Sequence, residues 1–269
     1  FQVYQHFVES KKDSFWKILL TPLLYIDVWK IKYWELKFWR KAKRVVAVSE
    51  ADKLKMQRLA PGLNVNVVSN GAGEELMAVW GKRRPEKEPT VFFQANFDWL
   101  QNIEAAQNLV KNVFPLIKKK IKNAQCWIVG QKAAEKTGYL KKDGVKIINL
   151  ETSDTASVID AYKRATVFVA PLEGPGGTRL KILAAMAAGV PVVTTKVGIE
   201  GIDAQDGSEV LIADDWRGMA EKTIRLLEEE ILYRKVVLAA RKLVEEKYSY
   251  KSIASVLDKI YRKVAYGKD

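Results

Sequence analysis

The sequence predicts an α/β protein whose main domain is a parallel β-sheet covered by helices on both faces. From Thr90 onward, short apolar runs alternate with longer helical segments. The runs are apolar throughout, which is typical of strands that are buried on both sides. One of them stops at Pro171, a glycine-rich loop follows, and a helix is expected from about Thr178. Together these observations indicate strands that are connected by crossover helices.

The elements of this domain can be placed by their patterns. Strands are expected near residues 90–95, 125–130, 145–149, 166–170, 191–195 and 209–213. Helices are expected near 101–121, 155–164, 178–188 and 215–229, and two more, roughly 231–247 and 250–265, close the chain. Such a domain is Rossmann-like. Ligands bind beyond the carboxyl ends of its strands, so the loops after 95, 130, 150 and 170 should line a site.

The first part of the chain contains fewer elements. Thr21 before Pro22 predicts the start of a helix that runs over 22–44. Strands are expected at 45–48 and 65–69, with a helix from Ser49 to about Leu59 between them. The basic, proline-flanked segment 82–89 is predicted to be an interdomain linker.

Composition excludes several classes of protein. The 269 residues include a single cysteine, Cys126, and a single histidine, His6, so an internal disulfide is ruled out and a histidine-built metal site or Ser-His-Asp triad is improbable. Cys126 lies in an apolar run and is expected to be a buried structural residue. No apolar stretch of about 18 residues and no signal peptide is recognised, so we expect a cytoplasmic protein. Because the first residue is Phe1, we also expect that the true N-terminus lies upstream.

The positive charge is concentrated near the start. The net charge is +13, and residues 11–44 contain ten Lys or Arg together with Trp16, Trp29, Trp34 and Trp39. Three interpretations stay open for this segment. Its aromatic residues could pack on the rest of a larger domain, with the lysines in solvent. It could instead bind an anionic membrane surface, or, less in keeping with a chain that has no recognised nucleic-acid module, a nucleic acid.

The glycine-rich loop suggests a site for an anion. Glycines let a main chain approach a ligand closely, and free N–H groups at a helix start attract phosphate. Arg179 and Lys181 could add charge-assisted contacts from the first helical turn. The alternative is a tight strand-to-helix turn without a ligand. The loop matches neither a Walker motif nor Gly-x-Gly-x-x-Gly, so the residues alone indicate only a possible phosphate site.

Residues 176–201, Gly-Gly-Thr-Arg-Leu-Lys-Ile-Leu-Ala-Ala-Met-Ala-Ala-Gly-Val-Pro-Val-Val-Thr-Thr-Lys-Val-Gly-Ile-Glu-Gly, closely resemble retaining family-4 glycosyltransferases of the GT-B fold. Similarity extends to 45–50, 68–71, 97–102 and 127–130. The resemblance implies two Rossmann-like domains: 1–75 would be the C-terminal part of an acceptor domain, and 76–248 a nucleotide-sugar donor domain. The helix in 249–269 would pack back on the acceptor domain.

The resemblance also implies which residues hold the donor. Glycine amides and basic side chains would bind the diphosphate, and residues at strand ends would hold the base or face the cleft. The donor-binding residues are then Gly176, Gly177, Thr178, Arg179, Lys181, Asn96, Gly130, Gln131, Asn149, Leu150 and Glu200. The catalytic residues stay unknown. No metal and no cofactor is implied, because the nucleotide-sugar is a substrate.

Some positions depart from the family pattern. Ala184 stands where the family usually places a ribose-binding glutamate, and Gln94-Ala95-Asn96 replaces a glycine-bearing turn. Glu173 or Glu200 could substitute for the missing acid. We therefore expect a retaining transferase that acts in polysaccharide biosynthesis on a lipid-linked or polysaccharide glycan, peripheral to the inner face of a membrane. The alternative is a non-catalytic relative with a degenerate donor site. This chain alone is expected to be inactive, because a cleft enzyme needs both walls.

Overall fold

The computed structural model describes residue 5 and residues 15–151, 154–174 and 179–267, with side chains described from residue 23 onward apart from Gln5. The chain divides into two compact units. One contains residues 1–69, 174–178 and 255–269, and the other contains 70–173 and 179–254. Both have parallel strands joined by helices, so the predicted α/β class is confirmed.

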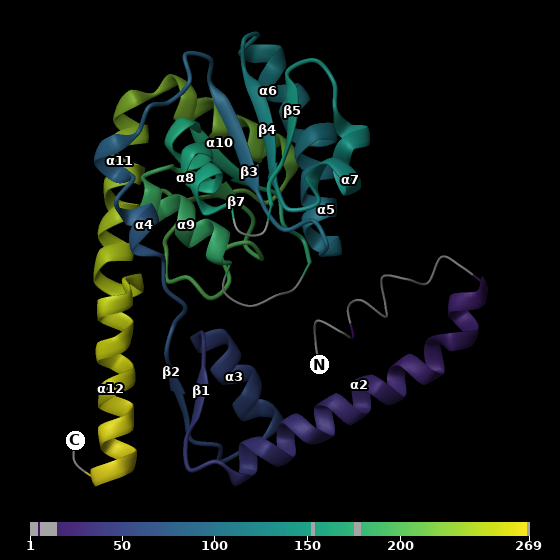
Figure 1. Cartoon of the computed structure of the whole chain (residues 1–269), viewed down its shortest axis with the longest axis vertical. Helices are drawn as coiled ribbons and strands as arrows, with labels where there is room; N and C mark the ends of the chain where they lie inside the picture. The colour runs from purple at the N-terminus through teal and green to yellow at the C-terminus, as the bar shows by residue number, and fades with distance from the viewer. Residues whose placement is uncertain (1–4, 6–14, 152–153, 175–178, 268–269) are drawn as a thin grey trace. The chain divides into compact units, whose positions relative to one another are not determined.

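The second unit is built on a six-stranded sheet in which every pairing is parallel (Figure 1). Its strands are β3 (Thr90–Gln94), β4 (Gln125–Gly130), β5 (Val145–Asn149), β6 (Val167–Ala170), β7 (Val192–Thr194) and β8 (Leu211–Ile212). Their order across the sheet is β5-β4-β3-β6-β7-β8. Numbered within the unit this is 3-2-1-4-5-6, the order of doubly wound nucleotide-binding sheets. All six strands lie where the sequence predicts them.

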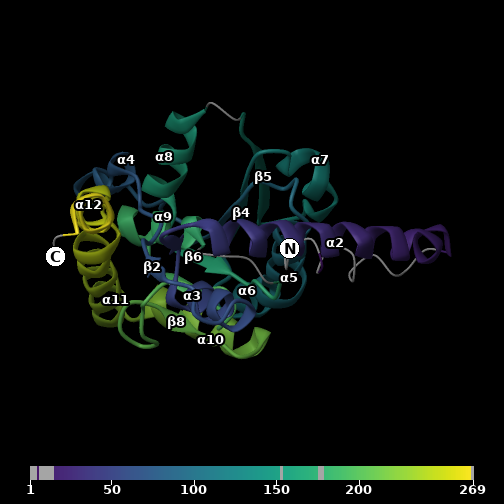
Figure 2. The same cartoon turned by 90° about the horizontal axis from the view of Figure 1, so that it is seen from below.

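Helices cover both faces of this sheet (Figure 2). One face carries α8 (Thr155–Arg164) and α9 (Leu180–Ala188); the other carries α5 (Leu100–Asn108), α6 (Phe114–Lys120), α7 (Ala133–Thr137) and α10 (Trp216–Glu228). The predicted helix 101–121 contains a π-helical turn, η2 (Leu109–Val113), just before Pro115. Proline has no N–H to donate, which accounts for an irregular turn at this place.

Shorter and later elements complete the unit. They are α4 (Glu74–Met77), the 3-10 turns η1 (Trp80–Lys82) and η3 (Gly138–Leu140), α11 (Glu230–Leu243) and the π-helical turn η4 (Val244–Tyr248). The helix α12 (Tyr250–Tyr266) begins in this unit and ends in the other.

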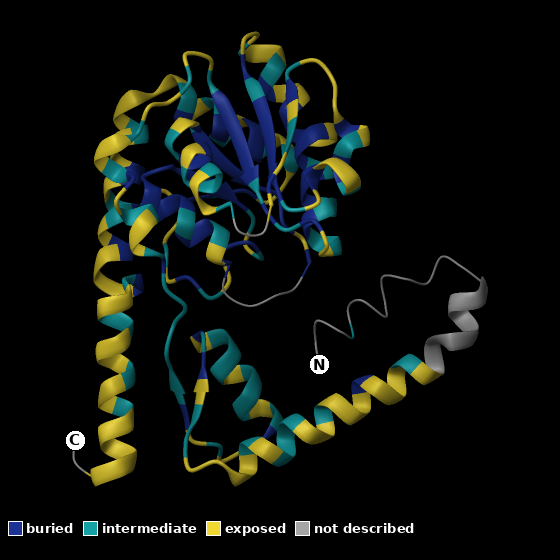
Figure 3. Ribbon diagram, viewed as in Figure 1, coloured by how far each residue is buried: buried dark blue, intermediate teal, exposed yellow. Residues whose placement is uncertain are grey.

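The core of the second unit lies between the sheet and its helices (Figure 3). Phe92, Phe168 and Tyr162 are fully buried and contact one another. The centres of the Phe92 and Tyr162 rings lie 5.0 Å apart, and the rings meet edge to face. Cys126 is buried in β4, and this burial raises the pKa of its thiol. A thiol held neutral is a poor nucleophile, which agrees with the structural role predicted for Cys126.

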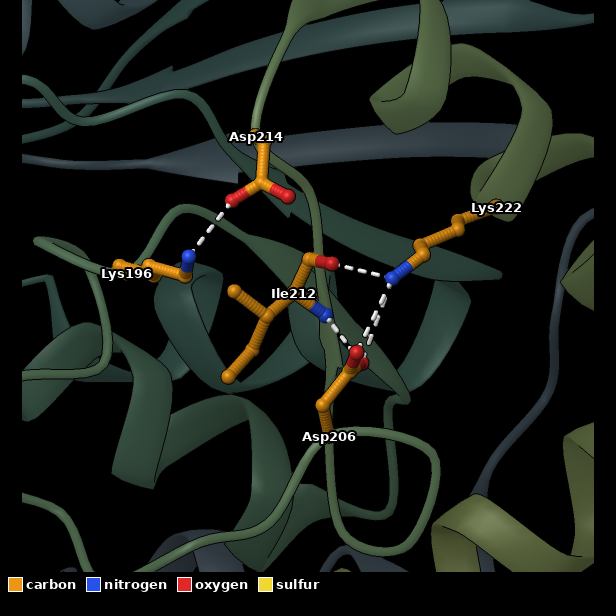
Figure 4. Close-up of polar contacts among 5 residues, drawn as sticks. All are labelled: Lys196, Asp206, Ile212, Asp214 and Lys222. Atoms are coloured by element: carbon orange, nitrogen blue, oxygen red, sulfur yellow. Dashed lines mark hydrogen bonds and ion pairs between the residues drawn. The ribbon is translucent and has the colours of Figure 1, made fainter.

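Charged side chains surround the edge strand β8 (Figure 4). The Asp206 carboxylate accepts a hydrogen bond from the Ile212 N–H at 2.7 Å, and Lys222 of α10 binds both the Asp206 carboxylate, at 3.1 Å, and the Ile212 carbonyl. Lys196 and Asp214 form an exposed ion pair at 3.1 Å. Charges of this kind satisfy the polar main-chain groups of an edge strand and discourage it from pairing with another chain.

The segment 82–89 is not the linker that the sequence predicts. Arg83 donates to the Gly189 carbonyl and to the Tyr233 hydroxyl, each at 2.6 Å, and the Glu86 N–H donates to the Arg164 carbonyl at 3.0 Å. These bonds tie the segment to the C-terminal ends of α8 and α9, where carbonyl groups lack helical partners and attract cations. The charge and proline content of the segment made it resemble a linker, whereas Arg83 attaches it to the rest of the unit.

The first unit contains a short parallel pair, β1 (Val45–Ala47) and β2 (Val65–Val67), joined by α3 (Glu50–Leu59). The Ser49 hydroxyl caps α3 by accepting from the Asp52 N–H at 3.0 Å. The helix α2 runs over Phe15–Lys41. The predicted start at Pro22 is wrong, because a helix of 27 residues tolerates the one hydrogen bond that an interior proline removes.

Much of the described part of α2 is exposed (Figure 3), and its exposed residues include several large apolar side chains. Trp29 is 65% exposed and Phe38 is 62% exposed, and lysines lie among them. The Lys37 ammonium lies 4.4 Å from the centre of a Trp34 ring. In the described residues, no helix combines enough length and apolarity to cross a membrane.

Candidate functional site

The strand order of the second unit places a candidate site at one edge of the sheet. Crossovers run in one direction from β3 through β4 to β5, and in the other direction from β6 through β7 to β8. The crossover connections therefore diverge between β3 and β6, and doubly wound sheets bind ligands at this point, beyond the carboxyl ends of the strands. The loops that follow β3 and β6, and the start of α9, lie at that edge.

Main-chain hydrogen bonds join the loops after β3 and β5 to the end of β4. Ala95 N–H donates to the Val129 carbonyl, and Leu150 N–H donates to the Gly130 carbonyl, each at 3.0 Å. Gly130 has a φ of +144°, and a Cβ atom there would lie 1.8 Å from the Ala95 carbonyl oxygen. Only glycine permits this approach, so Gly130 allows the end of β4 to lie close to the loop after β3.

A cavity of about 260 Å³ opens beside these loops. Three of the predicted donor-binding residues line it: Gln131, Asn149 and Leu150. The other lining residues were not predicted from sequence; they are Asp98, Lys132, Ala134, Glu135 and Glu151. The Asn149 side-chain oxygen accepts from the Ala134 N–H at 3.4 Å, which holds the start of α7 against the end of β5. Among the described non-glycine residues, only Lys132 has a positive φ, +58°.

On the other side of β3, Lys181 lies in the first turn of α9. Its ammonium donates to the side-chain oxygen of Asn102 and lies 5.1 Å from the centre of the Phe93 ring. The Asn102 amide in turn donates to the Asn96 carbonyl at 2.6 Å. Asn96 and Lys181 were both predicted as donor-binding residues, and Asn102 brings them together. Asn102 itself was not predicted.

The surroundings of Lys181 stabilise its positive charge poorly. Burial, and to a smaller extent the charge of Arg179, lower its pKa from 10.5 to about 7. Arg179 is buried, with 7% of its surface exposed, and its pKa is lowered by burial against the opposing effect of Glu200. A lysine that is held with little solvation favours the binding of an anion, which would restore its charged state.

The loop after β6 is attached to the neighbouring strand β7. The Thr195 hydroxyl donates to the Leu172 carbonyl and accepts from the Gly198 N–H at 2.9 Å. Thr194 donates to the Ala170 carbonyl at 2.8 Å. These bonds hold the start of this loop against the end of β7. The predicted phosphate-binding residues Gly176, Gly177 and Thr178 lie outside the described residues.

The position that departs from the family pattern lies on α9. Ala184 is partly buried, one turn after Lys181, and its methyl group offers no hydrogen-bond acceptor. Glu173 is exposed, and its carboxylate accepts from the Asn108 side chain at 3.1 Å. Glu200 is exposed and acts on Arg179 through its charge. Roles for Glu173 or Glu200 in holding a ribose stay predictions.

The sequence was compared with known families and proteins. Residues 88–229 match the family described as "Glycosyl transferases group 1". A relative from Klebsiella pneumoniae, described as an uncharacterized 44.6 kDa protein in the cps region, is 27% identical over 175 residues, which is 63% of this chain and 45% of that protein. N-acetyl-alpha-D-glucosaminyl L-malate synthase of Bacillus anthracis is 37% identical over 84 residues, 30% of this chain and 22% of the relative. The chain thus spans less than half of either relative.

Solved structures share the fold. A glycosyltransferase from Rickettsia africae has a TM-score of 0.69 at 17% identity, covering 89% of this chain and 68% of that one. Sucrose-phosphate synthase from Thermosynechococcus elongatus has a TM-score of 0.68 at 21% identity, covering 88% and 62%. The Anabaena protein HepE, solved with UDP and glucose, has a TM-score of 0.62 at 13% identity, covering 84% and 63%. The predicted GT-B fold class is confirmed, and because the family match covers more than half of its residues, the chain belongs to the group 1 glycosyltransferases.

Proposed function

We propose that the second unit binds the nucleoside diphosphate part of a nucleotide-sugar, and that the complete protein transfers the sugar to a glycan with retention of configuration and without a metal. The observation that carries this proposal is the position of Lys181, a partly desolvated ammonium at the switch point of a doubly wound sheet. Family membership supports a nucleotide donor, as does the structure of HepE, which was solved in complex with UDP and glucose.

The basic groups suit a leaving group whose negative charge increases. As the bond between sugar and diphosphate breaks, charge accumulates on the phosphate oxygens. Lys181 and Arg179 would stabilise that charge more strongly in a partly desolvated site than in water. Their fixed positions mean that little reorganisation is needed during the reaction. We assign both residues to the diphosphate.

The cavity beside β4 and β5 suits the nucleoside. Its volume of about 260 Å³ is smaller than the roughly 300–1,000 Å³ typical of complete ligand sites, so it would hold one part of the donor. Gln131 and Asn149 provide side-chain amides that can both donate and accept hydrogen bonds, and the buried Leu150 offers an apolar contact to a base. The close approach at Gly130 holds the loops that form this wall.

One observation favours a second function. Ala184 leaves α9 without the carboxylate that would accept a hydrogen bond from the ribose. An unmade polar contact of this kind weakens binding by about 1–3 kcal/mol. The chain could therefore come from a non-catalytic relative that retains the fold. Restoring the acid distinguishes the two functions.

We expect Ala184→Glu to strengthen binding of one of UDP, GDP or ADP by roughly tenfold, because a carboxylate on this turn would accept from the ribose hydroxyls. Thermal denaturation measures this: a ligand at 100 times its dissociation constant adds about 2.7 kcal/mol to the free energy of unfolding. Ala184→Leu is the matched control, with similar added bulk and no acceptor, and should show no gain. If neither the wild type nor Ala184→Glu is stabilised by any of the three nucleotides, the non-catalytic function is favoured.

For the acceptor, we propose a polysaccharide or lipid-linked glycan at an anionic membrane surface. The relative from a cps region supports a role in polysaccharide synthesis. The exposed tryptophan and phenylalanine side chains of α2, mixed with lysines, support contact with lipid headgroups, since aromatic rings favour the interface and cations favour anionic lipids. Nucleic acid is the less favoured partner.

Vesicle sedimentation tests the membrane contact. The chain should sediment with vesicles of phosphatidylglycerol and stay in solution with vesicles of phosphatidylcholine. Replacing both Trp29 and Phe38 by alanine should reduce the bound fraction several-fold, because these are the two most exposed large aromatic side chains described on α2. Alanine at the exposed Tyr261 and Tyr266 of α12 is the control. Equal binding to both kinds of vesicle would contradict an electrostatic contact.

A further inference from the structure

Asn102 makes a polar bridge across the candidate phosphate site. Only 6% of its surface is exposed. Its NH₂ group donates to the Asn96 carbonyl at 2.6 Å, and its oxygen accepts from the Lys181 ammonium. A lysine can only donate and a carbonyl can only accept, so these two partners fix the orientation of the amide. The bridge therefore joins the loop after β3 to the first turn of α9.

The partners of Lys181 among the described residues are all neutral. Its ammonium contacts the Asn102 amide and the face of the Phe93 ring, and its main-chain carbonyl lies 3.4 Å from the Tyr162 hydroxyl. Within the part of the chain that the structure describes, no carboxylate forms a salt bridge with Lys181. A half-buried cation with little solvation is normally paired with an acid, so an anion that enters from solvent would supply the missing charge.

We propose that Asn102 is a positioning residue for the donor: it aims the Lys181 ammonium at the diphosphate while leaving its charge unneutralised. This inference rests on the proposed function and assigns a specific role to an asparagine on α5. An aspartate at this position would also bind the lysine, but its carboxylate would neutralise the positive charge that the diphosphate requires.

The charged and titratable groups around Lys181 define the pH range. Arg179, the N-cap residue of the same helix, disfavours the protonated lysine, and burial raises the pKa of the Tyr162 hydroxyl on α8, so this group stays neutral. Asn102 on α5 and Phe93 on β3 do not titrate. The free lysine therefore loses its proton near pH 7, and a bound diphosphate would raise its pKa. At pH 8, binding should take up nearly one proton.

Chemical reactivity of the lysine tests the bridge without any nucleotide. In competitive acetylation followed by mass spectrometry, Lys181 of the wild-type chain should become reactive with a midpoint near pH 7. Asn102→Asp should raise this midpoint by more than one pH unit, and Asn102→Leu, which removes the acceptor, should not raise it. Asn112→Asp at an exposed position of η2 is the matched control and should leave it unchanged. An unchanged midpoint in both Asn102 variants would overturn the bridge.

Calorimetry tests the link to the donor. UDP, GDP and ADP are titrated into the 269-residue chain at pH 8 in two buffers of different ionisation enthalpy. The wild type should take up nearly one proton with the nucleotide it binds. Asn102→Asp should take up less than half a proton and bind at least tenfold more weakly. Equal proton uptake by the two proteins would refute the inference. Binding by neither, with the lysine midpoint still raised in Asn102→Asp, would overturn the proposed function and the donor role of Asn102, and would leave only the bridge itself supported.

Discussion

Replacing Lys181 by methionine should weaken binding of a nucleoside diphosphate by roughly 10- to 100-fold, the effect expected for one hydrogen bond to a charged group. Methionine has a similar length and no charge, so it should fill the space beside Phe93 and keep the fold. Calorimetric titration measures the loss. Lys119→Met on α6 is the matched control, because this exposed lysine lies just before β4, at the opposite edge of the sheet. Equal affinities for the two variants would remove Lys181 from the site.

The same substitution should stabilise the protein when no ligand is bound. The pKa of Lys181 falls from 10.5 to about 7 on folding, so the unfolded chain holds more protons between these values and the wild type gains stability as pH rises through this range. Below pH 7 the folded protein bears the full cost of desolvating the Lys181 ammonium. Urea denaturation should therefore show the advantage of Lys181→Met to be largest near pH 6 and smaller at pH 9. A constant advantage would contradict the lowered pKa.

Gly130→Ala should destabilise the protein by about 3 kcal/mol or more, because an unfavourable φ and a close main-chain contact add together. The new Cβ atom would lie 1.8 Å from the Ala95 carbonyl oxygen, so the loops after β3 and β4 must separate. Urea denaturation measures the loss. Gly207→Ala is the control: its φ of +76° is also unfavourable, but nothing lies within 4 Å of the added atom. Similar losses for the two variants would mean that the contact does not matter.

Where Gly130→Ala still folds, its nucleotide binding should also fall. The separated loops would move Gln131 and Leu150, which line the 260 Å³ cavity. The Gly207→Ala control should retain the wild-type affinity. Retained binding in a folded Gly130→Ala protein would place the nucleoside elsewhere.

The strands were predictable because a buried parallel strand needs an apolar residue at nearly every position. Phe92, Cys126 and Phe168, for example, are buried on strands that the pattern of apolar residues had already located. Local signals were less reliable at helix ends. The Thr21-Pro22 pair resembles a helix start, yet α2 begins at Phe15. The five-residue helix α7 was not predicted, since so short a segment has no measurable periodicity.

The site was only partly predictable, because its residues come from separate loops. Asn96 and Lys181 follow recognisable strand and helix boundaries, but Asn102 is 79 positions from Lys181 along the chain, and no local pattern reveals their contact. Asp98, Glu135 and Glu151 look like ordinary surface acids in the sequence, and only the fold brings them to one cavity. The roles of the predicted donor-binding residues, and the division into acceptor and donor domains, stay predictions.

The central claim is that the second unit binds a nucleoside diphosphate at the carboxyl edge of its sheet. Calorimetric titration of the wild-type chain with UDP, GDP and ADP tests it most directly, with Lys181→Met and Lys119→Met in parallel. We expect one of the three nucleotides to bind with a stoichiometry of one, with affinity lost in Lys181→Met and retained in Lys119→Met. No binding of any nucleotide, or binding that Lys181→Met leaves unchanged, would contradict the claim.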